Sequence, residues 1–168
     1  MDNSEYRFVY DYREPKKDIV LATFLEEKFY TDEYNRSSHD KIEFNSVVEK
    51  IAGIYNKKIF VPYKDIPHDW NSGKTYDLLF GVIIPESDMV ICDRGVVSFN
   101  DNKVTSWFVE CMVNRANELY IPVVHLNKAE EITSQIKFNR KKDCIVNFVL
   151  NVDAFIGIEK VIRNYYGV

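Results

Sequence analysis

Five short segments of this chain are predominantly apolar, and they constrain its fold more than any other feature. They are residues 18–24, 58–63, 88–92, 121–126 and 144–149. These segments are rich in β-branched residues and do not alternate apolar with polar positions, so both faces of each strand are expected to be buried. Strands of this kind are typical of a parallel sheet that is covered by helices on both sides.

Segments with helical periodicity separate the predicted strands. Ser37 or Ser38 is expected to cap a helix that ends near Tyr55, and shorter helices are expected over 75–84 and from 105 to about 120. A last helix is expected to carry its apolar residues on one face, at Phe155, Ile158, Ile162 and Tyr165. The alternation predicts an α/β fold with a flavodoxin-like, doubly wound, five-stranded parallel sheet and helices on both faces.

The length and composition fit one soluble domain over residues 1–168, in which residues 1–17 form an N-terminal arm or edge strand. The net charge of −4 argues against a nucleic-acid-binding surface, which needs a basic face. No secretory pattern and no long apolar run is present, so we expect no membrane association. Three widely spaced cysteines, Cys92, Cys111 and Cys144, favour free thiols and a cytoplasmic location.

Several common functional motifs are missing from the sequence. The chain has no GxGxxG, no Walker phosphate loop and no GxSxG, which weighs against dinucleotide-binding, P-loop and serine-hydrolase functions. His39, His68 and His125 lack metal-ligand spacing and no CxxC occurs, so no metal or cofactor is expected. His125 lies in an apolar strand and is interpreted as a hydrogen-bonded core histidine.

Polar and aromatic residues gather where the predicted strands end. In doubly wound sheets, ligands bind beyond the carboxyl ends of the strands, at the point where the strand order reverses. The loops after residues 24, 63, 92 and 126 are therefore expected to form a site. Its candidate residues are Thr23, Phe24, Tyr63, Asp65, Asp77, Asp93, Ser98, Asp101, Thr105, Ser106, Trp107 and Glu110.

Glu110, in the stretch TSWFVEC, has two competing interpretations. An acid in the first turn of a helix is common, because it complements the free N–H groups there. The predicted inward face of this helix consists of Phe108, Cys111, Met112, Ala116 and Leu119. Glu110 lies off that face, on a stripe with Trp107 and Asn114, so its carboxylate is also a candidate for chemistry at the edge of the sheet.

The order of these motifs resembles the nucleoside 2-deoxyribosyltransferase-like family, which includes nucleotide N-glycosidases. The resemblance covers about residues 18–126. It follows the strand end LATF, the phrase VPYKD, an aspartate-bearing helix, the strand SDMVICD, a loop, the glutamate of TSWFVEC and the strand IPVV. It implies that Glu110 is a nucleophile that attacks the anomeric carbon of a nucleoside or nucleotide. Asp77 or Asp93 would then assist departure of the base.

The resemblance also suggests roles for the other candidates. Phe24, Tyr63 and Trp107 would stack on the base or exclude solvent, unless they only pack in the core. Hydroxyl groups of Ser98, Thr105 and Ser106 would hold a 5′-phosphate, if the substrate carries one. Homo-oligomers are common in this family, so self-association is a further expectation.

Two alternatives remain open at this stage. The run from SDMVICD through TSWFVEC to IPVV also resembles the TIR domain, whose glutamate cleaves the nicotinamide–ribose bond of NAD. The second alternative is a sensor domain that binds a nucleotide without turnover. It is favoured by Met112 and Asn114, which stand where the first family usually has small residues.

Overall fold

The computed structural model describes residues 16–22, 38–66, 72–93, 96–99, 102–105, 107–128, 144–148 and 150–167. Its strands are β1 (Ile19–Ala22), β2 (Ile59–Phe60), β3 (Met89–Asp93), β4 (Val96–Phe99), β5 (Asn102–Thr105), β6 (Val123–Lys128) and β7 (Cys144–Phe148). Its helices are α2 (Ser38–Ile54), α3 (Pro62–Asp65), α4 (Ser72–Leu78), the π-helix η2 (Leu79–Ile83), α5 (Ile84–Glu86), α6 (Trp107–Glu118) and α7 (Asn151–Tyr166).

Five of the strands form one sheet in the order β2-β1-β3-β6-β7, and all of its pairings are parallel. This confirms the predicted five-stranded parallel sheet. β1 pairs with β3 over its whole length, from Ile19 opposite Met89 to Ala22 opposite Cys92. Every residue of β1 and β3 is buried, as expected for strands that are apolar on both faces.

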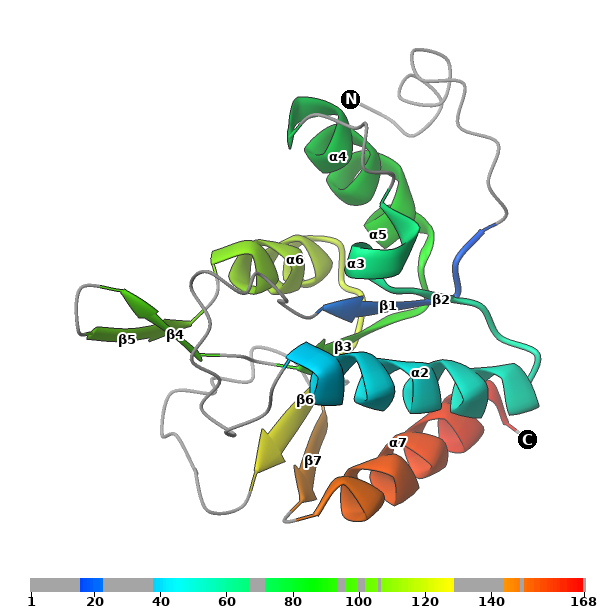
Figure 1. Ribbon diagram of the computed structural model, residues 1–168. Helices are drawn as coiled ribbons and strands as arrows, with labels where there is room; N and C mark the ends of the chain where they lie inside the picture. The colour runs from blue at the N-terminus through cyan, green and yellow to red at the C-terminus, as the bar shows by residue number, and fades with distance from the viewer. Residues whose placement is uncertain are drawn as a thin grey trace.

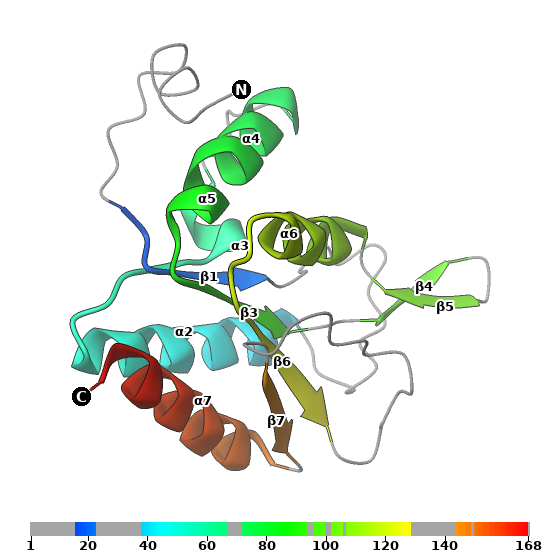
Figure 2. The same ribbon diagram turned by 180° about the vertical axis from the view of Figure 1, so that it is seen from behind.

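Helices cover both faces of this sheet (Figures 1 and 2). α2 and α7 pack on one face, in an apolar cluster with Leu21 and Ile91. α6 and the segment η2–α5 pack on the other face, in a second cluster with Val20 and Val90. Adjacent residues of one strand thus belong to different clusters, because side chains alternate between the faces of a strand.

Three local expectations were wrong. Strand β2 ends at Phe60, because Pro62 occupies the first turn of α3, where its missing N–H costs nothing. The expected polar loop from Arg94 to Lys103 contains an antiparallel hairpin, β4–β5, which projects beyond the carboxyl ends of β1 and β3 (Figure 1). The helix expected over 75–84 belongs to a longer helical stretch from Ser72 to Glu86 with a π-turn inside it.

The predicted inward faces of two helices also need correction. In α7 the buried residues are Ala154, Ile158 and Ile162, whereas Tyr165 is 48% exposed because it lies beyond the end of the packed face. In α6 the buried residues are Val109, Met112, Val113 and Ala116, and Phe108, Cys111 and Leu119 are only half-buried. The expected N-terminal arm lies almost wholly outside the described residues. No helix in the described part of the chain is both long and apolar enough to cross a bilayer.

Contacts at the amino ends of the strands fix α7 against the sheet. The Tyr166 hydroxyl donates a hydrogen bond to Asp88 Oδ2 at 2.9 Å, and Lys16 pairs with the other oxygen of Asp88 at 3.3 Å. The Lys57 ammonium lies 4.1 Å from the centre of the Tyr166 ring. Burial and the nearby Asp88 carboxylate both raise the pKa of Tyr166, so the phenol stays protonated and acts as a donor over the neutral pH range.

Two glycines in helices are expected to respond in opposite ways to alanine. A Cβ at Gly53 would meet no atom within 4 Å, so Gly53→Ala should raise the free energy of unfolding by up to about 1 kcal/mol. A Cβ at Gly157 would overlap the Val146 side chain, so Gly157→Ala should lower the free energy of unfolding by about 1–3 kcal/mol. Urea unfolding of both variants measures the difference, and equal effects would contradict the packing of α7 on β7.

The contact between Tyr166 and Asp88 gives a second stability test. Tyr166→Phe should lower the free energy of unfolding by about 1 kcal/mol, because it removes one hydrogen bond to a carboxylate in a partly exposed site. Tyr165→Phe is the matched control, since the Tyr165 hydroxyl has no hydrogen bond to another described residue, and its effect should be near zero. Urea unfolding at pH 7 compares the two variants, and equal losses would exclude the Asp88 contact as a stabilising interaction.

Candidate functional site

The candidate site lies at the carboxyl ends of β1 and β3. From β1 the chain passes through α2 to β2 on one side, and from β3 it passes through α6 to β6 on the other side. The strand order therefore reverses at the border between β1 and β3. This border is where parallel α/β sheets bind their ligands, because the departing segments separate there.

Glu110 lies in the first turn of α6, which packs over β3, β1 and β6. Its side chain is half-buried, and it stands beside the buried stripe of α6 and not within it. The free N–H groups of a helix N-terminus favour a negative charge within the first turn. The prediction that Glu110 lies off the packed face at the start of this helix is thus confirmed, although the packed face itself is rotated from the predicted one.

Cys111, the next residue of α6, is not suited to act as a thiolate. Burial raises the pKa of the Cys111 thiol, and the negative charge of Glu110 raises it further. A raised pKa keeps the thiol protonated at neutral pH, so it is a weak nucleophile. Cys92 is buried, Cys144 is half-buried, and all three cysteines are free thiols. Of the nucleophilic side chains at the start of α6, Glu110 is therefore the more plausible one.

Asp93 is the last residue of β3 and is fully buried. It lies opposite Leu126 of β6, one residue beyond the pair formed by Ala22 and Cys92. A fully buried aspartate is unusual in proteins, because an ionised carboxylate loses its hydration there. Asp93 thus lies at the end of β3, next to the border where the strand order reverses. The sequence analysis predicted a polar residue at this position.

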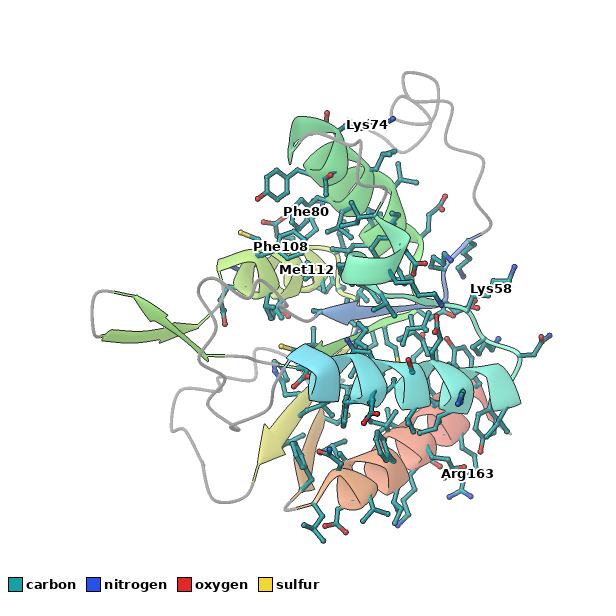
Figure 3. All side chains as sticks on the ribbon, in the orientation of Figure 1. Lys58, Lys74, Phe80, Phe108, Met112 and Arg163 are labelled. Atoms are coloured by element: carbon teal, nitrogen blue, oxygen red, sulfur yellow. The ribbon has the colours of Figure 1, made fainter. Side chains whose placement is uncertain are left out.

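Asp77 lies in α4 and is half-buried. An aromatic cluster joins this part of the chain to the first turn of α6. The ring centres of Tyr76 and Phe80 are 5.6 Å apart, and each lies within 6.5 Å of the Phe108 ring centre. Figure 3 shows Phe80 and Phe108 together between α4 and α6. The cluster brings α4, with Asp77, next to the turn that carries Glu110.

The π-turn in this region is stabilised by a side chain of α6. Arg115 Nε donates a hydrogen bond to the main-chain oxygen of Phe80 at 2.9 Å. A π-turn changes the regular main-chain pairing of a helix, and turns of this kind are frequent at functional sites. The contact holds η2 against α6 and so fixes the position of Phe80.

Asp65 has a local structural role. Its Oδ2 accepts a hydrogen bond from the main-chain N–H of Val61 at 2.8 Å. The carboxylate thereby satisfies an N–H group at the start of α3. Its candidacy as a ligand-binding residue therefore loses support, and a sequence pattern of an acid three residues after Pro62 is compatible with this capping role. Tyr63 belongs to α3, but its side chain lies outside the described residues.

Three further predicted site residues belong to the hairpin β4–β5 and to the start of α6. Ser98 lies in β4 and Thr105 in β5, opposite Lys103 and Val96 respectively, and their side chains are not among those described. Trp107 is the first residue of α6, and again only its main chain is described. Thr23, Phe24, Asp101 and Ser106 lie outside the described residues.

Two buried polar residues complete the region around the sheet edge. His125 is 2% exposed within β6, which confirms that it is a core histidine. Asn45 of α2 is fully buried, and neither its Oδ1 nor its Nδ2 has a hydrogen-bond partner in the described part of the chain. Sequence reasoning missed Asn45, although it shares a helical stripe with the apolar residues Val48 and Ala52.

No group of three or more His, Cys, Asp or Glu side chains that could hold a metal ion occurs within the described ranges. Comparisons with known proteins add no assignment. A scan against models of protein families found no match, and searches among curated proteins and solved structures found no similar protein.

The reactivity of Cys111 should report the charge of Glu110. Removing that negative charge by Glu110→Gln should lower the pKa of Cys111 and increase its alkylation rate at pH 8 about twofold, because more thiolate is present. Peptide mass spectrometry after timed iodoacetamide treatment measures this rate. Glu118→Gln, at the other end of α6, is the control and should leave the rate unchanged. An unchanged rate in Glu110→Gln would show that Glu110 is uncharged or points away from Cys111.

Proposed function

We propose that this protein cleaves or exchanges the N-glycosidic bond of a nucleoside or nucleotide, with Glu110 as the nucleophile. The observation that carries the proposal is the position of Glu110 in the first turn of α6, beside the border between β1 and β3. The strand order and the helices on both faces support a flavodoxin-like, doubly wound assignment, in which this border is the ligand site.

The chemistry requires an ionised carboxylate next to the sugar. When the bond between C1′ and the base nitrogen breaks, positive charge develops at C1′ and its ring oxygen. The Glu110 carboxylate would stabilise this charge and form an ester bond to C1′, while the base departs with the bonding electrons. Water or another base would then attack C1′ and release Glu110. Glu110 lies in the first turn of α6, where the free N–H groups of a helix N-terminus attract negative charge.

A second acid is needed to protonate the departing base or to orient the sugar. Asp93 and Asp77 are the two candidates, since Asp93 ends β3 and Asp77 lies in α4, which the aromatic cluster joins to the start of α6. Asp77 lies in α4, on the same side of the sheet as α6, so it is our first choice for the acid, and Asp93 at the end of β3 is the candidate that orients the sugar.

The departure from the resembled family at Met112 does not argue against the proposed enzyme. Met112 is fully buried in the cluster between α6 and the sheet. Met112 follows Glu110 by two residues, a rotation of about 200° around the helix axis. Measured the shorter way round, the two side chains point about 160° apart. The bulk of Met112 therefore lies away from the side of α6 on which a sugar would contact Glu110, and crowding by Met112 no longer favours a sensor without turnover.

Base release by Glu110 variants tests the proposal directly. The wild-type protein should release free bases from nucleosides or nucleoside monophosphates, and Glu110→Gln and Glu110→Ala should each reduce the rate at least about 10³-fold, because the nucleophile is lost. Liquid chromatography of timed reactions with ribo- and deoxyribo-substrates and NAD measures the products. Glu118→Gln on the same helix should keep the wild-type rate.

The substrate panel also separates the alternatives. Release of nicotinamide from NAD, with nucleosides left intact, would instead identify a TIR-like NAD glycohydrolase. A thermal shift by a nucleotide without any product would indicate a binding domain. Activity that survives in Glu110→Ala would exclude the assigned role of Glu110 in either enzyme.

A further inference from the structure

The amide of Asn45 is an unsatisfied buried polar group. The residue is 0% exposed, and neither Oδ1 nor Nδ2 has a hydrogen-bond partner among the described residues. Buried side-chain polar atoms nearly always have a partner, because burial without one is destabilising. A buried amide without a donor bond or an acceptor bond inside the protein is expected where a bound ligand provides both partners.

The side of α2 on which Asn45 lies is the side that faces the sheet. Asn45 falls on one helical stripe with Val48 and Ala52, which pack against β1 and β3 in the same apolar cluster. The neighbouring stripe turns toward α7, where the Phe44 ring lies 4.9 Å from that of Phe155. Asn45 is thus directed at the sheet and not at α7 or solvent.

The height of Asn45 along the sheet follows from the register of the strands. α2 returns from β1 to β2, so it runs opposite to the strands, and its last residue, Ile54, lies near their amino ends. From Ile54 back to Asn45 is about 13 Å along the helix. From Met89 to Asp93 is also about 13 Å along β3. Asn45 therefore lies near the carboxyl end of β3, the end that carries Asp93.

Asn45 and Asp93 also share one face of the sheet. Met89 and Ile91 belong to the cluster under α2, and Asp93 follows them at the same alternating positions. The two buried polar side chains therefore lie at the same end of the sheet and between the same layers. Both belong to the α2 side of the sheet, which is the side opposite Glu110.

We propose that Asn45 binds a ribose hydroxyl of the substrate. This assignment rests on the proposed function and names its sugar. A hydroxyl both donates and accepts, so it can accept from Asn45 Nδ2 and donate to Asn45 Oδ1, and a carboxylate such as Asp93 accepts from a second hydroxyl. A donor–acceptor amide and a carboxylate at the same end of the sheet and on the same face match the adjacent 2′- and 3′-hydroxyls of ribose. The substrate class is then a ribonucleoside or ribonucleotide, not its 2′-deoxy form.

Asn45→Leu tests the assignment with two independent readouts. Leucine has a similar volume and no polar atom, so the ligand-free variant should melt about 2–6 °C above the wild type. The wild type should bind an equimolar mixture of AMP, GMP, CMP and UMP at least about 10-fold more tightly than the same mixture of 2′-deoxy forms. A ligand without the 2′-hydroxyl would leave the Asn45 amide unpaired, and that weakens binding. Asn45→Leu should remove that preference. Asn164→Leu, at an exposed position of α7, should change neither value.

Three results would overturn the assignment. A lower melting temperature for Asn45→Leu would mean that its amide is already bonded in the ligand-free protein. A higher melting temperature with an unchanged preference for ribonucleotides would mean that Asn45 has no ligand. The absence of a ribonucleotide preference in the wild type would exclude a ribose hydroxyl. Binding that follows the prediction without base release by any variant would instead remove the proposed function and leave the role of Asn45 intact.

Discussion

The burial of β1 and β3 on both faces is the constraint on which the rest of this structure depends. Every residue of the two strands is buried, so each face needs a helical layer to exclude water. One connection must then cross on the side of α2 and the next on the side of α6, and the strand order reverses between β1 and β3 as a result. The hydrophobic requirement of the two strands thereby creates the open edge at which polar residues gather.

Much of this architecture could be predicted from the sequence, because burial on both faces gives a strand a visible pattern. The five apolar runs became the five strands of the sheet, with ends shifted by a few residues. The hairpin β4–β5 was missed because it does not pair with the main sheet, so polar residues such as Ser98 are tolerated and no apolar run marks it. The early end of β2 was missed because Pro62 was interpreted as the end of a strand, whereas it begins α3.

The candidate site was less accessible from the sequence, for a different physical reason. Periodicity reports where apolar residues are buried, so Glu110 could be located by its absence from the apolar face of α6. The same reasoning failed for Asn45, because a single polar residue in a helix is normally assigned to the solvent side. Asn45 is buried because it shares the packed side of α2 with Val48 and Ala52. The capping contact of Asp65 was not predicted, because its partner is a main-chain N–H group, which no side-chain pattern reveals.

The two faces of the sheet divide the proposed chemistry. Glu110 belongs to the layer of α6, and Asn45 belongs to the layer of α2, with the end of β3 between them. A sugar that lies across the end of β3 would therefore meet the nucleophile on one side and its hydroxyl-binding groups on the other. Because the two groups are held by different helices, recognition of the sugar and stabilisation of the charge at C1′ can be altered separately by mutation. That separation is a property of the crossover topology, and it does not depend on which base the proposed reaction would release.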